Sequence, residues 1–278
     1  MHFFIILYIT RKSNFSVGFA YKYLRSLGLS RPEAFISSHW IYKESRDYHI
    51  FKNRLHDRGK LRKPLEYILG TTDFYKMKDF IVQEPNLVPR PETERMVDLI
   101  VSSRKSEPRV FVDLCCGTGN IAVALLRAWP NSFCIAVDIS EQAIENTRIN
   151  AEKFNVSERL KLFHGSIDDF GKCFKAFDMA PELIVSNPPY IPSANICHLQ
   201  PEILRWESHC ALDGGQDGMH CIREIIKVFK KTSEIWLEVD AESDQCDKIQ
   251  AEVVGRFQSF VEKDWRGCNR FIRLFSVT

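Results

Sequence analysis

The sequence predicts an α/β protein whose main domain contains a doubly wound sheet, preceded by a small helical domain and a β-hairpin linker. From residue 108 onward, short apolar segments typical of buried strands alternate with segments typical of helices. A glycine-bearing turn between a strand and a helix, and an acid that ends the following strand, indicate where such a sheet binds its ligand. The 278 residues suffice for one large domain and a small appendage.

Residues 18–60 are expected to form the helical domain. Ser30 has the position of a helix N-cap, with Pro32 in the first turn and Glu33 where a capping box needs an acid. Apolar and aromatic side chains then recur near helical spacing, which predicts helices with one apolar face. These side chains are Phe35, Ile36, Trp40, Ile41, Tyr48, Phe51 and Leu55.

The N-terminal segment is apolar and basic. Its first ten residues form an apolar run before Arg11 and Lys12, far shorter than the roughly 20 residues that span a bilayer, so no membrane span is expected. Residues 1–25 contain four basic side chains and no acid, a composition compatible with a mitochondrial transit peptide. An ordinary first strand or helix, or a misassigned start, is the alternative.

Proline and glycine interrupt residues 61–90, which are expected to form a β-hairpin or an irregular linker. Two short apolar pieces, 67–69 and 80–82, are the expected strands. A helix is expected to begin after Pro91, and the main domain is assigned to residues 91–278.

The main domain alternates strands and helices and contains no internal repeat or low-complexity segment. This alternation predicts a parallel sheet with helices on both faces. Strands are expected at 110–114, 133–137, 160–163, 183–185, 235–239 and 271–275, and helices at 121–128, 141–153, 218–231 and 243–256.

The composition argues against some classes of protein. A net charge of +2 does not suit a nucleic-acid binder that works mainly by bulk attraction to phosphate. Nine cysteines occur without a CxxC pair, so a zinc site has little support and no metal is expected. Their odd number and scattered positions favour a reducing intracellular compartment.

The segment 113–120 lies between a strand and a helix and has glycines at 117 and 119. It lacks the GxGxxG and GK[ST] patterns, so a dinucleotide or P-loop phosphate site is poorly supported. Asp113 is expected to face a cationic or amine-bearing ligand, and Asp138, which ends the next strand, suits the two hydroxyls of a ribose. S-adenosylmethionine has both features. The alternative is that the glycines only shape a tight turn and Asp138 caps a helix.

The segment 187–190 places two prolines directly after a predicted strand. Prolines cannot continue a central strand, so they stiffen a turn and determine where Asn187 and Tyr190 point. The Asn187 side chain can accept one hydrogen of a planar –NH2 group, a backbone carbonyl of the Pro-Pro segment can accept the other, and Tyr190 can stack on the group. We therefore expect methyl transfer to the nitrogen of a planar –NH2 group, achieved by positioning. A Pro-Pro turn capped by asparagine is the alternative.

Four segments together resemble the HemK or PrmC family of release-factor glutamine methyltransferases. Asn-Pro-Pro-Tyr at 187–190 is typical of methyltransferases that act on planar nitrogens. Pro-Leu-Glu-Tyr-Ile-Leu-Gly at 64–70, Leu-Val-Pro-Arg-Pro-Glu-Thr-Glu at 87–94 and Ala-Leu-Asp-Gly-Gly-Gln-Asp-Gly at 211–218 narrow the resemblance to this family. The resemblance covers about residues 60–275, and 87–94 is its most specific part.

The resemblance implies a seven-stranded, Rossmann-like class I methyltransferase domain that uses S-adenosylmethionine and has an antiparallel last strand. It implies methylation of the side-chain amide nitrogen N5 of the glutamine in the Gly-Gly-Gln motif of class I peptide-chain release factors, in support of translation termination. It also implies that the helical domain recognises the substrate, although packing alone is an equally good interpretation of residues 1–60. We further expect a monomer, located in mitochondria or otherwise in the cytoplasm.

The resemblance also assigns site residues. The expected cofactor-binding residues are Asp113, Cys115, Cys116, Gly117, Thr118, Gly119, Asp138, Ile167 and Asn187. The expected catalytic and substrate-binding residues are Asn187, Pro188, Pro189 and Tyr190, with Arg90 and Glu92 at the edge of the cleft. Two departures from the family pattern occur. Cys115 stands where a glycine is usual, and Ser166 with Ile167 replaces an acid–aromatic pair, which predicts weaker binding of adenine.

Two other functions stay open at this point. An adenine N6-methyltransferase of nucleic acid shares the Asn-Pro-Pro-Tyr turn, but it must take a base out of its stack and usually has a strongly basic groove. A catalytically silent binding or assembly factor with this fold usually loses the asparagine or the glycine turn, and both are present here.

Overall fold

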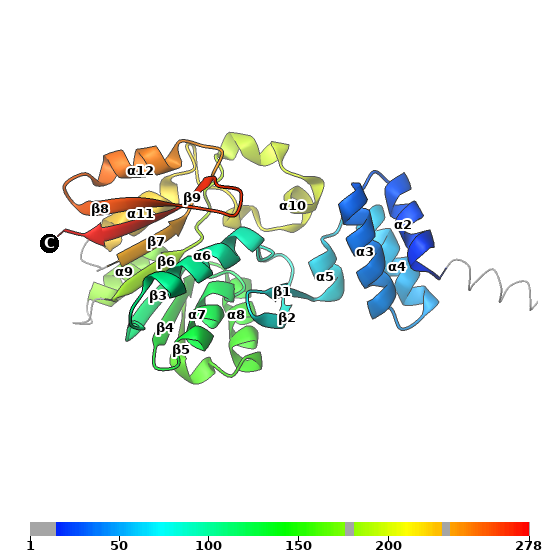
Figure 1. Ribbon diagram of the computed structural model, residues 1–278, viewed down its shortest axis with the longest axis horizontal. Coiled ribbons are helices and arrows are strands. Elements are labelled where there is room, and N and C mark those ends of the chain that lie inside the picture. The colour runs from blue at the N-terminus through cyan, green and yellow to red at the C-terminus, as the bar shows by residue number, and fades with distance from the viewer. Residues whose placement is uncertain (1–14, 176–180, 230–233, 278) are drawn as a thin grey trace, which may run out of the picture. The chain divides into compact units, whose positions relative to one another are not determined.

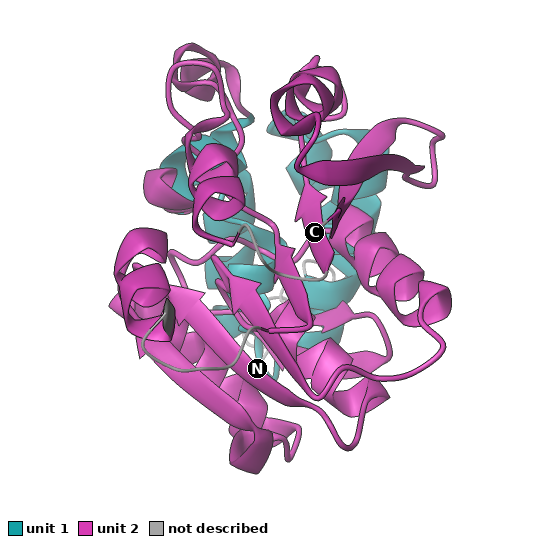
Figure 2. Cartoon of the chain, turned by 90° about the vertical axis from the view of Figure 1, so that its left-hand side faces the viewer, with its two compact units in different colours: residues 1–71, 200–206 teal, residues 72–199, 207–278 magenta. Residues whose placement is uncertain are grey.

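The computed structural model describes residues 15–175, 181–229 and 234–277. The chain divides into two compact units, coloured separately in Figure 2. Unit 1 comprises Met1–Thr71 and Gln200–Trp206, and unit 2 comprises Thr72–Leu199 and Glu207–Thr278. The division falls inside the linker predicted at 61–90. Residues 1–14, which carry most of the predicted transit peptide, lie outside the described residues.

Unit 1 is helical, as the sequence predicts. Its helices are α2 (Val17–Ser26), α3 (Arg31–Glu44), α4 (Tyr48–Gly59), α5 (Leu65–Leu69) and α10 (Pro201–Trp206). The capping box at the start of α3 is present, since Ser30 accepts a hydrogen bond from the Glu33 amide and the Glu33 carboxylate accepts one from the Ser30 amide. Leu24, Ile41 and Phe51 are among the buried core residues.

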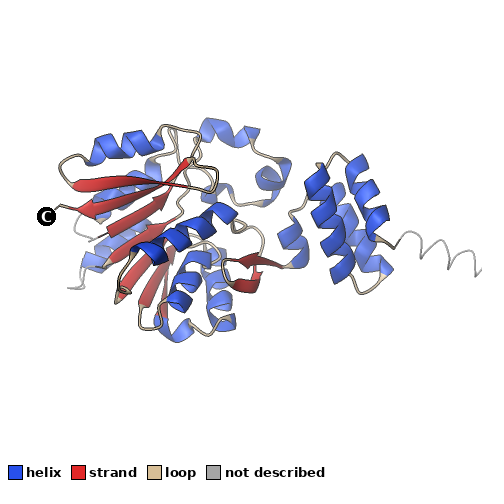
Figure 3. Cartoon of the chain, viewed as in Figure 1, coloured by secondary structure: helices blue, strands red, loops and turns tan. Residues whose placement is uncertain are grey.

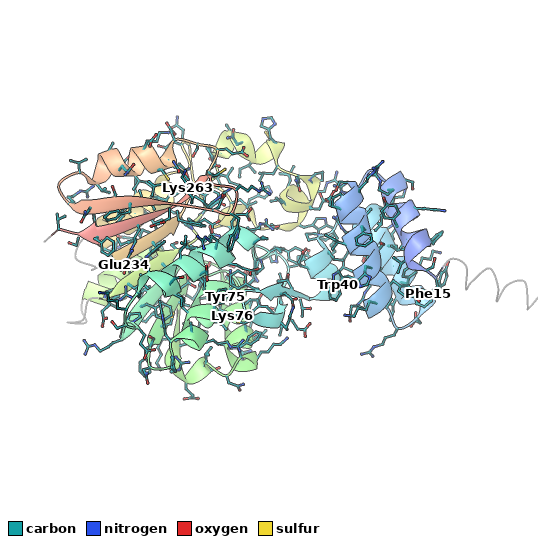
Figure 4. All side chains as sticks on the ribbon, viewed as in Figure 1. Phe15, Trp40, Tyr75, Lys76, Glu234 and Lys263 are labelled. Atoms are coloured by element: carbon teal, nitrogen blue, oxygen red, sulfur yellow. The ribbon has the colours of Figure 1, made fainter. Side chains whose placement is uncertain are left out.

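The predicted strand at 67–69 is wrong, because these residues belong to helix α5. Pro64 precedes the helix and Gly70 ends it in the left-handed conformation, with φ at 79°. A three-residue apolar run cannot by itself distinguish a helix from a strand, and the flanking proline and glycine decide for a helix. The hairpin is formed by β1 (Thr71–Phe74) and β2 (Met77–Ile81), and β2 contains most of the strand expected at 80–82. Tyr75 and Lys76, labelled in Figure 4, form its turn.

Helix α10 belongs to unit 1 although it is distant in sequence. Its Glu202 carboxylate accepts hydrogen bonds from Arg58 and Arg62, both at 2.8 Å. The Trp206 indole donates to the Leu61 carbonyl at 3.0 Å. Helix α10 is thus held to the rest of unit 1 by an ion-pair cluster, which no local sequence signal predicts.

Within the described residues, unit 2 contains a seven-stranded sheet with the order β5-β4-β3-β6-β7-β9-β8 (Figures 1 and 3). The last strand in the sequence, β9, pairs antiparallel with both β7 and β8, which confirms the expected fold class. The sequence pattern predicted no strand at the position of β8. The strands are β3 (Val110–Leu114), β4 (Phe133–Asp138), β5 (Leu160–His164), β6 (Leu183–Ser186), β7 (Glu234–Glu238), β8 (Phe257–Lys263) and β9 (Asn269–Ser276).

Helices cover both faces of this sheet (Figure 1). Successive strand residues alternate between the two sides, so that Phe111 packs with the cluster under α6, α7 and α8 and Val112 with the cluster under α9, α11 and α12. The helices are α6 (Pro91–Ser103), α7 (Asn120–Ala128), α8 (Glu141–Lys153), α9 (Ile167–Lys175), α11 (His220–Val228) and α12 (Gln245–Val253). Among the described residues we find no helix with the length and apolar character that a membrane crossing requires.

Candidate functional site

A cavity of about 430 Å³ lies in unit 2 at the carboxyl ends of the parallel strands. Residues that directly follow β3, β4, β5 and β6 line it, together with parts of the segments 86–93 and 208–224. Ligands of open α/β sheets bind at this edge, because the strand-to-helix turns expose backbone amides and side chains there. The sequence placed its candidate residues at the same edge.

The β3–α7 turn supplies one wall of the cavity. Cys115, Cys116, Gly117 and Thr118 line it as expected. Gly117 has a φ of 55°, and a Cβ added there would meet no atom within 4 Å, so its backbone is open to a ligand. Gly119 does not line the cavity. A Cβ on Gly119 would lie 2.7 Å from the Thr147 side chain, so this glycine allows α7 to pack closely against α8.

Asp113 does not face the ligand cavity, which corrects the expectation for this residue. Its side chain is fully buried within the sheet layer, and one carboxylate oxygen accepts a hydrogen bond from the Ala122 amide in the first turn of α7 at 3.0 Å. The other oxygen has no hydrogen-bond partner. Burial raises the pKa of Asp113 to about 8, against the opposing effect of the Ala122 amide. The amides at the start of α7 draw the side chain away from the cavity.

Asp138 lines the cavity at the end of β4. Its two carboxylate oxygens accept hydrogen bonds from the amides of Gly117 and Ser140, both at 2.9 Å. Burial raises its pKa, and these two amides oppose the rise. Helix α8 is capped by Ser140, whose hydroxyl accepts from the Ala143 amide, so Asp138 is not the side-chain cap of that helix. Each carboxylate oxygen keeps acceptor capacity for a ligand hydroxyl, which fits a ribose.

Ser166 and Ile167 follow β5 and also line the cavity. The Ser166 hydroxyl accepts a hydrogen bond from the Asp169 amide at 3.1 Å, so it serves the first turn of α9. Ile167 is 7% exposed and gives the cavity an apolar wall without an aromatic face. An adenine ring would therefore meet van der Waals contact there and no aromatic stacking from this residue.

The Asn-Pro-Pro-Tyr turn begins directly after β6, and Asn187 and Pro189 line the cavity. Pro188 and Tyr190 do not. The expected stacking of Tyr190 on the substrate is corrected, because its phenol donates to the Glu238 carboxylate at 3.4 Å. Burial and the nearby carboxylate of Glu238 raise the pKa of Tyr190, so the phenol keeps its proton.

The segment 211–218 packs against the backbone of this turn. Ile191 donates to the Leu212 carbonyl at 3.0 Å and accepts from the Gly214 amide at 2.8 Å. A Cβ on Gly218 would collide with the Tyr190 carbonyl oxygen and would lie 2.5 Å from the Gln245 amide nitrogen. Gly214 and Gly218 are therefore required by close contact with the backbone of the Asn-Pro-Pro-Tyr turn.

The segment 87–94 contributes to the cavity lining both Arg90, which the sequence predicted as a site residue, and Thr93, which it did not. Arg90 lines the cavity and donates to both carboxylate oxygens of buried Glu207, at 2.8 and 2.7 Å. Glu92 does not line the cavity. Thr93 does, and its hydroxyl joins Asn187 to Glu238 at the end of β7. The sequence could have indicated Glu238 as a site residue, since it ends a strand at this edge of the sheet as Asp138 does.

The chain is similar to known methyltransferases over most of its length. A family model described as "Methyltransferase domain" matches residues 105–259. The release factor glutamine methyltransferase of Geobacter sulfurreducens is 35% identical over 220 residues, which cover 77% of this chain and 74% of that protein. The chain belongs to the release factor glutamine methyltransferase family.

Other relatives match over a smaller share of their length. The release factor glutamine methyltransferase of Gloeobacter violaceus is 41% identical over 165 residues, which cover 59% of this chain and 55% of that protein. The human "MTRF1L release factor glutamine methyltransferase" is 34% identical over 199 residues, which cover 67% of this chain and 58% of that protein. The match thus spans little more than half of these two relatives.

Family membership confirms that the chain is a methyltransferase and that its cofactor is S-adenosylmethionine. The cavity of this methyltransferase fits that cofactor on two observations. The carboxylate of Asp138 is held toward the cavity by backbone amides, and the open backbone at Gly117 lets a ligand approach. In the described part of the chain, no group of three or more His, Cys, Asp or Glu side chains is arranged to hold a metal ion.

Proposed function

We propose that this methyltransferase methylates the side-chain amide nitrogen N5 of the glutamine in the Gly-Gly-Gln motif of class I peptide-chain release factors. The names of its relatives support this substrate class. The observation that carries the proposal is the placement of Asn187, which lines the same cavity as Asp138 and has its –NH2 group bonded to Thr93. Its side-chain oxygen is left to accept a hydrogen from a planar substrate amide.

Bound S-adenosylmethionine supplies an electrophilic methyl group, and the protein positions the cofactor and the substrate amide relative to each other. Asp138 and the β3–α7 turn hold the cofactor, while Asn187 and a backbone carbonyl of the Pro-Pro segment accept the two N–H groups of the glutamine amide. Accepting both hydrogens increases electron density on a nitrogen that is otherwise a poor nucleophile. Fixing the two reactants in line contributes about 7–11 kcal/mol in well-oriented systems.

A direct assay tests this substrate. Purified class I release factor and a duplex oligonucleotide rich in adenine are each incubated with isotope-labelled S-adenosylmethionine and the enzyme. We expect one methyl group on the Gly-Gly-Gln peptide, detected by mass spectrometry, and none on the oligonucleotide. Label on the oligonucleotide alone would replace the proposal by a nucleic-acid adenine methyltransferase. No label on either, with cofactor binding intact, would also overturn the release-factor substrate.

The helical unit is proposed to recognise the protein substrate. On α3, the side chains of Phe35, Ile36 and Trp40 are 64%, 50% and 37% exposed, and Figure 4 labels Trp40 on this unit. Exposed aromatic side chains are typical of surfaces that bind other proteins. Replacing Phe35 and Trp40 by alanine should raise the KM for intact release factor and leave turnover of a short Gly-Gly-Gln peptide unchanged. Equal effects on both substrates would contradict this role.

We also propose that the protein is located in mitochondria and that it acts as a monomer. The four basic side chains and the absence of acid in residues 1–25 support the location. A fluorescent protein fused behind residues 1–30 should enter mitochondria, and replacing Arg11 and Lys12 by glutamate should abolish entry. A uniformly cytoplasmic fusion protein would favour the cytoplasm instead. Sedimentation of the purified enzyme tests the monomer.

A further inference from the structure

A continuous set of hydrogen bonds runs behind the substrate-facing side of Asn187. The Asn187 side-chain nitrogen donates to the Thr93 hydroxyl at 3.2 Å, and the Thr93 hydroxyl donates to one Glu238 oxygen at 2.8 Å. The other Glu238 oxygen accepts from the Tyr190 phenol at 3.4 Å. Thr93 and Glu238 are each 1% exposed, so water does not compete for these bonds.

We propose that Thr93 and Glu238 are positioning residues that determine which way the Asn187 amide faces. This inference rests on the proposed function of the site. A threonine hydroxyl has one hydrogen, and here that hydrogen is donated to the carboxylate. The Thr93 oxygen can then only accept, so it must be met by the –NH2 group of Asn187. The Asn187 oxygen is therefore turned toward the cavity.

The direction of the Asn187 amide matters because its two ends have opposite hydrogen-bonding character. A substrate amide that offers N–H groups needs the Asn187 oxygen. If the Asn187 amide were rotated by half a turn, its –NH2 group would face the –NH2 group of the substrate and no hydrogen bond would form. Asn187 alone has no preference between the two orientations, since the amide is nearly symmetric in shape. The Thr93–Glu238 pair removes that ambiguity before the substrate arrives.

The pair depends on an ionised Glu238. A protonated Glu238 can itself donate to Thr93, which would free the Thr93 hydrogen to face a rotated Asn187. Burial raises the pKa of Glu238 to about 7, and like charge on Glu92 adds to the rise. The Thr93 and Tyr190 hydroxyls and the charge of Arg270 oppose it. Activity that needs the charged form should therefore be lost as the pH falls through about 7.

Replacing Thr93 by valine keeps the shape of the side chain and removes the hydroxyl. With release factor as substrate, we expect Thr93→Val to lower kcat by about 100-fold, the order of effect that follows from a misplaced reacting group. The dissociation constant of S-adenosylmethionine should not change. Thr93→Ser should restore most of the activity, and Thr72→Val, which removes a half-buried hydroxyl on β1 outside the cavity lining, should match the wild type.

Three outcomes of the Thr93 series would be contrary to expectation, and they differ in what they overturn. If the wild type itself does not methylate release factor, the proposed function falls. If the wild type is active and folded Thr93→Val is equally active, the positioning inference falls alone. If Thr93→Ser is as impaired as Thr93→Val, the hydroxyl is not the important feature and the inference also falls.

Glu238→Gln gives a second and independent measurement. The amide cannot ionise, so we expect a lower kcat and loss of the activity change near pH 7. Glu234→Gln is the control, because Glu234 is a buried carboxylate at the other end of β7 (labelled in Figure 4) that pairs with Arg104 and Arg273. It should lower the melting temperature without altering the shape of the pH profile. A wild-type pH profile in Glu238→Gln would overturn the inference.

Discussion

The Asp138 carboxylate accepts a hydrogen bond from the backbone amide of Gly117 at 2.9 Å. This bond joins the end of β4 to the turn that follows β3, because these two strands are parallel neighbours in the sheet. Two segments that the sequence singled out separately thus form one wall of the cavity. It also explains how a half-buried carboxylate is kept in place before a ligand binds, since backbone amides hold both of its oxygens.

Asp138→Ala should chiefly weaken cofactor binding. The charged acceptor for the ribose hydroxyls is lost, and hydrogen bonds to charged groups contribute about 1.5–3 kcal/mol. We expect the dissociation constant of S-adenosylmethionine to rise about 10- to 100-fold in calorimetry, with Asp244→Ala, at an exposed acid, as the control. An affinity equal to that of the wild type would remove Asp138 from the ribose site.

Asn187→Ala should have the opposite profile. The cavity wall that holds the cofactor is untouched, so S-adenosylmethionine should bind with an affinity close to that of the wild type. Methyl transfer to release factor should fall by about 100- to 1,000-fold, the range found when one catalytic hydrogen-bonding group is deleted. The measurement is single-turnover transfer of labelled methyl at saturating cofactor. A large loss of cofactor affinity would contradict the substrate-facing role of Asn187.

Gly218→Ala should destabilise the protein more than Gly255→Ala does. Both glycines have a positive φ, 74° and 76°, so both substitutions carry the same conformational cost. A Cβ at Gly255 meets no atom within 4 Å, whereas one at Gly218 collides with Tyr190 and Gln245. We expect Gly218→Ala to cost about 1–3 kcal/mol more in the free energy of unfolding, measured by denaturant titration. Equal costs would show that the contact is not restrictive.

Asp113→Asn should change how stability depends on pH. The folded state keeps a proton on Asp113 up to a pKa of about 8, whereas the unfolded chain loses it near its ordinary value of 3.8. Between these values the folded state binds more protons, so Asp113 makes the free energy of unfolding fall as the pH rises, at most about 1.4 kcal/mol per pH unit. The free energy of unfolding of Asp113→Asn, relative to that of the wild type, should therefore be higher at pH 8 than at pH 5.

Thermal or urea unfolding across this pH range checks the prediction for Asp113. Asp79→Asn, at an exposed position in β2, should keep the pH dependence of the wild type. The same slope in Asp113→Asn and in the wild type would show that Asp113 is not protonated in the folded state.

Much of the main domain could be predicted because its signals are local. Buried parallel strands are continuous apolar runs, and the helices between them follow a 3.6-residue period, so the sequence predicts most of their positions. The short hairpin region was harder, since 67–69 forms a helix. Strand β8 was missed because it lies at the sheet edge, where only Phe257 is buried and the residues form no continuous apolar run.

The candidate site also has one part that the sequence predicts and another part that it does not. Asp138 ends β4, Gly117 lies in the turn after β3, and Asn187 directly follows β6. The parallel arrangement brings these positions to one edge of the sheet, so the sequence by itself determined that they share a cavity. Only the tertiary structure decided which neighbouring side chains point into it. Asp113 turns toward the start of α7 and Tyr190 toward Glu238, and Thr93 reaches Glu238 across 145 residues of sequence. Such contacts depend on how β7 and α6 pack, and no local pattern carries that information.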